Sequence, residues 1–107
     1  MSDSKRGHKL LTEELKDSLP AMYSQDDNPD PMVHVKFFSP YSDWTWFATE
    51  YDPESRVFFG LVKGFATELG TFGLDELDEV MVFGDVPGIE RDLHWEPKLL
   101  SEVKNEL

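Results

Sequence analysis

Between Met32 and Phe72 the chain alternates between apolar and polar positions in short runs, which turn-forming residues separate. Alternation with a period of two is typical of β-strands that bury one face. Because only a few residues connect successive runs, we expect neighbouring strands to be antiparallel and to form a meander. The runs predict four strands, at Met32–Phe38, Trp44–Glu50, Arg56–Lys63 and Phe65–Phe72.

Apolar residues at helical spacing flank this stretch on both sides. They predict a first helix that Thr12 caps and Pro20 ends, and two more at Leu74–Met81 and Lys98–Glu106. A further short strand is predicted at Ile89–His94. Together the patterns predict an α+β fold, with an antiparallel meander sheet of four to five strands and short helices packed on one face.

The length of 107 residues suits one hydrophobic core and is too short for two. Residues 1–9 are polar and without pattern, which predicts a flexible N-terminal arm ahead of a single domain at residues 10–107. The chain has no cysteine, which excludes disulfides and thiolate chemistry. No apolar run is long enough to span a bilayer and no signal-peptide pattern opens the chain, so we expect a soluble cytoplasmic protein.

The charge balance is strongly acidic, with 22 acidic against 10 basic residues and a net charge of −12. Such a surface repels nucleic acids and anionic lipids, because affinity for phosphate comes largely from Lys and Arg. It attracts basic proteins instead. We therefore expect a basic, nucleic-acid-binding protein as partner, with no cofactor and no direct contact with nucleic acid or membrane. An acid-rich source proteome is the alternative that composition leaves open.

Short motifs follow one another in order between Leu10 and Lys98. They are Leu10-Leu11-Thr12, Leu19-Pro20, Tyr23-Ser24-Gln25, Asp30-Pro31, Val35-Lys36-Phe37-Phe38, Trp44-Thr45-Trp46, Ala48-Thr49-Glu50, Phe58-Phe59-Gly60, Glu68-Leu69-Gly70 and Ile89-Glu90-Arg91-Asp92-Leu93. On these motifs the chain resembles a small bacterial family, frequent on plasmids and phages, known as domain of unknown function 2958. The resemblance implies a mobile-element setting and supplies no catalytic residue.

Three residues near the C-terminus are weak candidates for a metal site. Glu90, Asp92 and His94 would share one face of the strand predicted at Ile89–His94. Two carboxylates and an imidazole can ligate a divalent ion, which would suit a small hydrolase. The alternative is an ordinary solvated face of an edge strand.

Trp44 and Trp46 lie two residues apart, so both should point to the same side of their strand. In the core they would only stabilise the fold. On the surface they would bind a partner protein or stack on nucleic-acid bases. Because base stacking normally comes with a basic groove, the net charge favours a protein partner over nucleic acid.

Acidic residues also gather in two stretches without Lys or Arg, at residues 17–35 and 64–90. If the stretches meet in space, they would form one anionic surface dense enough to imitate a nucleic-acid backbone. Otherwise they are a solvated loop and a solvated helix face. The candidate partner-binding acids are Asp26, Asp27, Asp30, Glu68, Asp75, Glu76, Asp78, Glu79 and Asp85.

Three functional hypotheses follow. The leading one is a non-enzymatic interaction protein of a mobile element, whose acidic surface binds a basic host protein. In its narrower form this protein inhibits a defence system as a nucleic-acid mimic. The alternatives are a metal-dependent hydrolase built on the Glu90 group and a nucleic-acid-binding module built on the aromatic sheet.

Overall fold

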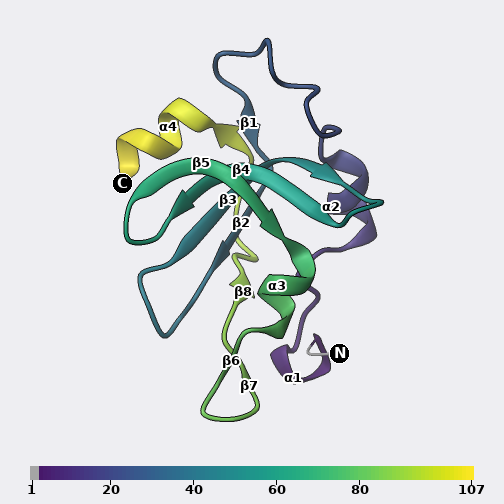
Figure 1. The fold of residues 1–107 in the computed structure, drawn as a ribbon, viewed down its shortest axis with the longest axis vertical. Helices are drawn as coiled ribbons and strands as arrows, with labels where there is room; N and C mark the ends of the chain where they lie inside the picture. Colours follow the sequence, from purple (N-terminus) through teal and green to yellow (C-terminus); the bar gives the residue numbers. More distant parts are fainter. Residues whose placement is uncertain (1–2) are drawn as a thin grey trace.

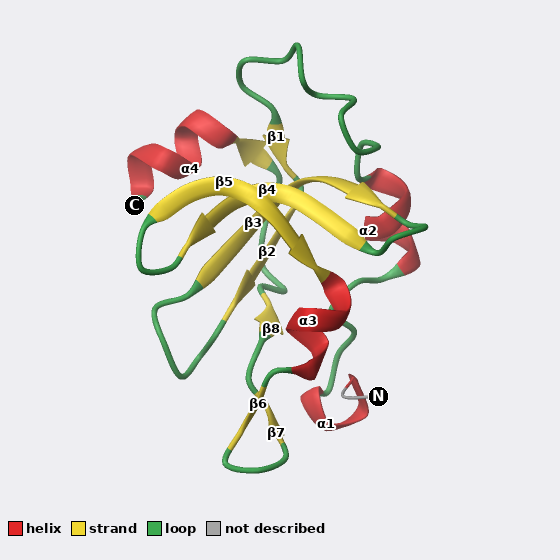
Figure 2. Ribbon diagram, viewed as in Figure 1, coloured by secondary structure: helices red, strands yellow, loops and turns green. Residues whose placement is uncertain are grey.

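The computed structural model describes residues 3–107, and its centre is a five-stranded antiparallel sheet in the order β5-β4-β3-β2-β8 (Figures 1 and 2). Four consecutive strands form the predicted meander, and β8 joins it at the edge beside β2. The α+β fold class and the antiparallel sheet are therefore confirmed. The strands are β2 (Val35–Phe38), β3 (Thr45–Asp52), β4 (Val57–Lys63), β5 (Thr67–Gly73) and β8 (Glu90–Arg91).

Two smaller strand pairs and four short helices surround this sheet (Figure 2). Strand β1 (Met32–Val33) pairs with β9 (Lys98–Leu99), and β6 (Met81–Val82) forms a hairpin with β7 (Val86–Pro87). The helices are α1 (Asp3–Arg6), α2 (Glu13–Ser18), α3 (Leu74–Glu79) and α4 (Leu100–Glu106). Thr12 caps α2 as predicted, because its side chain accepts a hydrogen bond from the Leu15 N–H at 3.2 Å.

The sheet buries apolar side chains on both faces, and each face has its own core. The first core includes Phe37 and Phe58 from the strands, with Leu77 of α3. The second includes Phe47 and Leu61, against Leu100 and Val103 of α4. The prediction that the helices pack on one face is therefore wrong in this detail. Because side chains alternate between the two faces of a strand, Phe47 and Leu61 lie on the face opposite the first core. Helix α4 covers them there.

A β-bulge in β3 changes which side chains face each core. Ala48 pairs with Gly60 and Glu50 with Phe59, so the intervening residue is unpaired. Without the bulge, Glu50 would share the face of Ala48. With it, Tyr51 joins the first core, and Glu50 turns to the second face of the sheet.

The N-terminal segment, where the sequence predicted a flexible arm, packs against the domain from Asp3 onward. The side chain of Arg6 is only 1% exposed. Its guanidinium donates hydrogen bonds to the Ile89 carbonyl and to Asp3, both at 2.7 Å, and pairs with Asp78 at 3.4 Å. The contacts with Ile89 and Asp78 connect residues far apart in the sequence, which a local polarity pattern does not reveal.

Two histidines should make folding stability fall on mild acidification. Burial lowers the pKa of His34, and burial together with the cations Arg91 and Arg6 lowers the pKa of His8. His8 Nε2 accepts a hydrogen bond from the Arg91 N–H at 3.2 Å, which requires that nitrogen to be unprotonated. As the pH falls through about 6.5, the unfolded chain takes up protons that the folded chain resists, so the free energy of unfolding decreases.

Urea denaturation at about pH 7.5 and about pH 5.5 measures this effect. The double variant His8→Gln, His34→Gln separates the contribution of the two histidines from that of the carboxylates, because every carboxylate is retained. We expect the wild type to lose more stability between the two pH values than the double variant does. Equal losses would contradict the assignment.

Candidate functional site

Half-buried Trp44 and exposed Phe65 form an aromatic pair beside the β4–β5 turn. Their ring centroids lie 5.3 Å apart at 84°, and the Phe65 side chain is 99% exposed. Trp46 lies beside Trp44, with ring centroids 5.9 Å apart. Trp46 also packs against the first core. The two tryptophans are both half-buried and connect the core to the surface.

The strand register places Glu68 on the same face of the sheet as Trp46. Trp46 pairs with Val62 on β4, and Val62 pairs with Glu68 on β5, so these three side chains share one face. A shallow hollow of about 260 Å³ lies there, lined by Trp44, Val62, Gly64, Phe65, Ala66 and Glu68. We define the aromatic surface as Trp44, Trp46, Val62, Phe65 and Glu68. Three of the predicted partner-binding residues thus come together.

Gly64 makes this arrangement possible. The Trp44 ring lies on the backbone of the β4–β5 turn, and a Cβ atom at position 64 would overlap ring carbons of Trp44. The Gly64 N–H donates to the Ala66 carbonyl at 3.0 Å, which closes the turn and leaves Phe65 at its tip. The apolar–polar alternation predicted a strand that begins at Phe65, but β5 begins at Thr67. Gly64, directly before Phe65, was the signal in the sequence for a turn with an exposed aromatic residue.

A second aromatic pair joins two other turns. Tyr41 of the β2–β3 loop meets Phe83 of the β6–β7 hairpin edge-on, with ring centroids 5.5 Å apart. Phe83 is 82% exposed and has a positive φ of 53°. Sequence reasoning missed both residues, although Gly84 directly after Phe83 indicates a turn.

The aspartates of the acidic 24–31 loop have different surroundings. Asp30 accepts hydrogen bonds from the Ser101 hydroxyl at 2.6 Å and the Ser101 N–H at 2.8 Å, which lower the pKa of Asp30. Asp30 therefore anchors the start of α4. Asp26 and Asp27 are exposed and form no ion pair with any residue in the described range 3–107. Their predicted role in partner binding stays a prediction.

Several acids at the other end of the molecule neutralise basic side chains. Arg56 pairs with Asp75 at 2.9 Å, and Lys5 pairs with Asp85 at 3.2 Å. Asp78 is bound to the buried Arg6 described above. The remaining two acids of α3 that we predicted to bind a partner are exposed, namely Glu76 and Glu79.

The two acidic stretches do not form one anionic surface. The 24–31 loop projects at the top of Figure 1, whereas α3 and the β6–β7 hairpin lie in its lower half. The molecule measures 42 Å along this vertical axis. The condition on which the nucleic-acid-like surface depended is therefore not met, because the sheet separates the two groups of acids.

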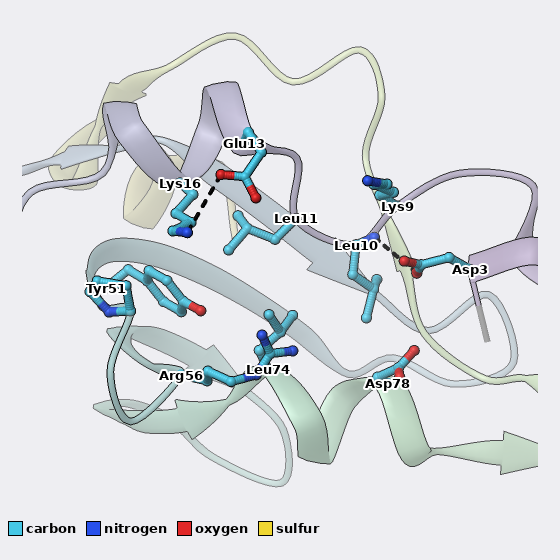
Figure 3. Close-up of a pocket in the computed structure, with 11 residues that line it drawn as sticks. Asp3, Lys9, Leu10, Leu11, Glu13, Lys16, Tyr51, Arg56, Leu74 and Asp78 are labelled. Carbon is cyan, nitrogen blue, oxygen red and sulfur yellow. Dashed lines mark hydrogen bonds and ion pairs between the residues drawn. The ribbon is translucent and has the colours of Figure 1, made fainter. Parts of the chain in front are cut away.

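A mixed-charge hollow of about 280 Å³ lies between α2, α3 and the β3–β4 turn (Figure 3). Lys16, Arg56 and the Tyr51 hydroxyl project into it. Burial raises the pKa of Tyr51. Both cations already have carboxylate partners, since Lys16 pairs with Glu13 at 3.5 Å and Arg56 with an aspartate of α3. The charges in this hollow therefore compensate one another.

The three candidate metal ligands are not assembled. Strand β8 ends at Arg91, and the Trp95 N–H donates to the Asp92 carbonyl at 3.2 Å, so the chain turns after Arg91. The predicted strand had to continue to His94 for the three side chains to share one face. Asp92 accepts a hydrogen bond from the His94 N–H at 3.0 Å and pairs with Lys36 at 3.8 Å. Within residues 3–107, no cluster of three or more His, Cys, Asp or Glu side chains could hold a metal ion.

Comparison with known proteins identifies a family. The model of a family described as "Protein of unknown function (DUF2958)" matches residues 10–103. No curated protein and no solved structure matches the chain. Across the described part of the chain, none of the helices has the length and apolar character needed to cross a membrane.

Proposed function

The chain belongs to the DUF2958 family, for which no function is given, and from this starting point we propose that it is a non-enzymatic interaction protein that binds a basic partner protein through the aromatic surface. The contact of exposed Phe65 with half-buried Trp44 carries the proposal, because a phenylalanine that is 99% exposed contributes little to the stability of the fold. Exposed aromatic side chains are the usual anchors of protein–protein interfaces.

The chemistry of the hollow favours a basic side chain from the partner. Trp44 and Phe65 present aromatic rings, which attract Lys and Arg through cation–π interactions. Glu68 supplies a carboxylate on the same side of the sheet, where it can pair with the incoming charge. A guanidinium or ammonium group of a partner would thus meet both kinds of contact in one place.

The overall charge supports the same class of partner. A net charge of −12 attracts basic proteins over long distances and repels nucleic acids. Lys63, the nearest cation in the strand, points to the opposite face from Val62 and so does not offer a phosphate contact at the aromatic surface. The mobile-element setting and the inhibition of a defence system are narrower parts of this proposal. If the protein occupies the nucleic-acid site of its partner, DNA should compete with it for that partner.

Capture of partners from a bacterial lysate, with mass-spectrometric identification at low and moderate salt, tests the proposal. We expect the wild type to capture a basic protein that Phe65→Ala captures poorly, with at least about 30-fold lower affinity if Phe65 is an interface anchor. Glu68→Lys should also weaken capture. Glu14→Lys is its matched control, because it changes the net charge equally at an exposed position on α2.

Nuclear magnetic resonance with the captured protein locates the interface. The indole N–H signals of Trp44 and Trp46 should shift on binding. The signal of Trp95 should not, because its indole donates to the Val33 carbonyl at 3.1 Å in the second core. Capture that is unchanged by Phe65→Ala and Glu68→Lys at low salt would refute the proposal.

A further inference from the structure

The second face of the sheet carries a separate hollow of about 260 Å³. It lies between α4, the acidic 24–31 loop, and strands β3 to β5. Phe59, Leu69 and Leu100 supply apolar wall, and Asp26 and Glu50 supply carboxylates. None of these residues belongs to the aromatic surface. We call this hollow the Glu50 pocket.

Glu50 is a buried carboxylate, with only 3% of the residue exposed. The β-bulge turns it toward this face, where it lies opposite Phe59 in the strand register. Its Oε2 atom accepts a hydrogen bond from the backbone N–H of Gln25 at 2.7 Å. The strand and the loop together therefore hold the carboxylate in a fixed position at the pocket.

The other carboxylate oxygen of Glu50, Oε1, has no protein partner within the described residues. Lys104 also lines the pocket but forms no ion pair with Glu50. Among residues 3–107, no side-chain oxygen or nitrogen is both sealed from solvent and unpaired. Oε1 therefore keeps some exposure to solvent, and Glu50 is one of the residues that line the Glu50 pocket.

A carboxylate withdrawn from water is costly unless a cation or several hydrogen-bond donors compensate it. Here the chain supplies one backbone donor to Oε2 and, within residues 3–107, no partner to Oε1. We propose that the Glu50 pocket binds a cationic nitrogen group, an ammonium or a guanidinium, carried on an apolar stem.

Each part of the proposed ligand has a counterpart in the pocket. The cationic group would donate a hydrogen bond to Oε1, with Asp26 as a second negative charge. The stem would contact Phe59, Leu69 and Leu100. Such a group occurs in free amines and guanidines and in the Lys or Arg side chains of peptides. The inference does not depend on the aromatic surface, because the two sites face opposite sides of β5, as adjacent residues Glu68 and Leu69 show.

A titration with butylguanidinium, followed by nuclear magnetic resonance, tests the proposal. The backbone N–H of Gln25 reports on the site, because it donates to Glu50. We expect saturable shifts at this amide and none at the indole signals of Trp44 and Trp46. N-butylurea is the neutral compound of matched shape, and it should bind at least about 10-fold more weakly.

Two substitutions with opposite expected effects sharpen the test. Glu50→Gln keeps the shape and removes the charge, so it should weaken butylguanidinium binding at least about 10-fold. Lys104→Gln removes a competing cation at an exposed position and should strengthen binding about 2- to 5-fold. If Glu50→Gln fails to fold, Lys104→Gln still decides the question. Glu68→Gln is the control and should leave binding unchanged.

A blocked peptide with one arginine distinguishes the two sources of the group. Stronger binding of the peptide than of butylguanidinium would assign the pocket to a partner's side chain, and the reverse order would assign it to a small molecule. Equal responses to butylguanidinium and N-butylurea, or no response at Gln25 to either cation, would overturn the proposal. Unchanged binding by both pocket variants would overturn it as well.

Discussion

Gly60→Ala should abolish folding. A Cβ atom at position 60 would overlap the carbonyl oxygen of Phe47 and would lie 3.1 Å from the Cα atom of Ala48. Both belong to the backbone of the adjacent strand, so no side-chain rotation relieves the overlap, and β3 and β4 would have to separate at the bulge. We expect a loss of more than about 5 kcal/mol, which is comparable to the whole stability of a small domain.

Circular dichroism and the dispersion of proton signals measure the outcome. Gly70→Ala is the matched control, because Gly70 pairs with Gly60 in the neighbouring strand, yet a Cβ atom at position 70 would have no neighbour within 4 Å. It should fold normally. A Gly60→Ala protein with a native spectrum and a wild-type urea midpoint would show that the strands approach less closely than the structure indicates.

Phe58→Ala should have the largest effect among truncations of the first core. Phe58 is fully buried, and its ring lies 4.6 Å from Tyr51, 5.2 Å from Phe72 and 5.3 Å from Phe37, measured between centroids. Removing it leaves a cavity among three rings from three other strands. Truncation of a buried phenylalanine costs about 3–5 kcal/mol.

Equilibrium urea denaturation gives the free energy of unfolding for this variant. Phe65→Ala is the matched control, since it deletes the same atoms from a side chain that is 99% exposed. That change should stay within about 0.5 kcal/mol of the wild type. Similar losses in the two variants would mean that Phe65 packs against the fold, which would also weaken the proposed interface.

The two proposed sites lie on opposite faces of the same sheet. The aromatic surface is exposed and anchored by Trp46 in the first core, whereas the Glu50 pocket is formed by elements that meet only on the second face. Glu68 and Leu69 are neighbours in β5, yet they line different hollows. The alternation along β5 therefore places the two sites on opposite faces.

The sequence by itself determined the meander and the antiparallel order of its four strands. Alternation of apolar and polar residues is a local property, and the short connections leave adjacent antiparallel pairing as the simple solution. The cap at Thr12 and the common side of Trp44 and Trp46 followed from the same local rules, although β3 begins at Thr45, one residue after Trp44. The family could also be identified from the sequence, because its motifs are short local segments.

Only the tertiary structure decided where the acids and the candidate ligand-binding groups lie. Ion pairs such as Arg6 with Asp78 join distant segments, so charge counts along the chain overstate the free negative charge of α3. The turn after Arg91 separates the predicted metal ligands, because β8 has a pairing partner for only two residues.

The bulge in β3 is the decisive case. An unbroken alternation places Glu50 on the face of Ala48, in the first core, whereas one unpaired residue moves it to the second face. The periodicity of the sequence does not reveal the unpaired residue, because a bulge is a mismatch between two paired strands and not a property of either strand alone. The buried carboxylate and its pocket therefore became visible only once β3 and β4 were paired.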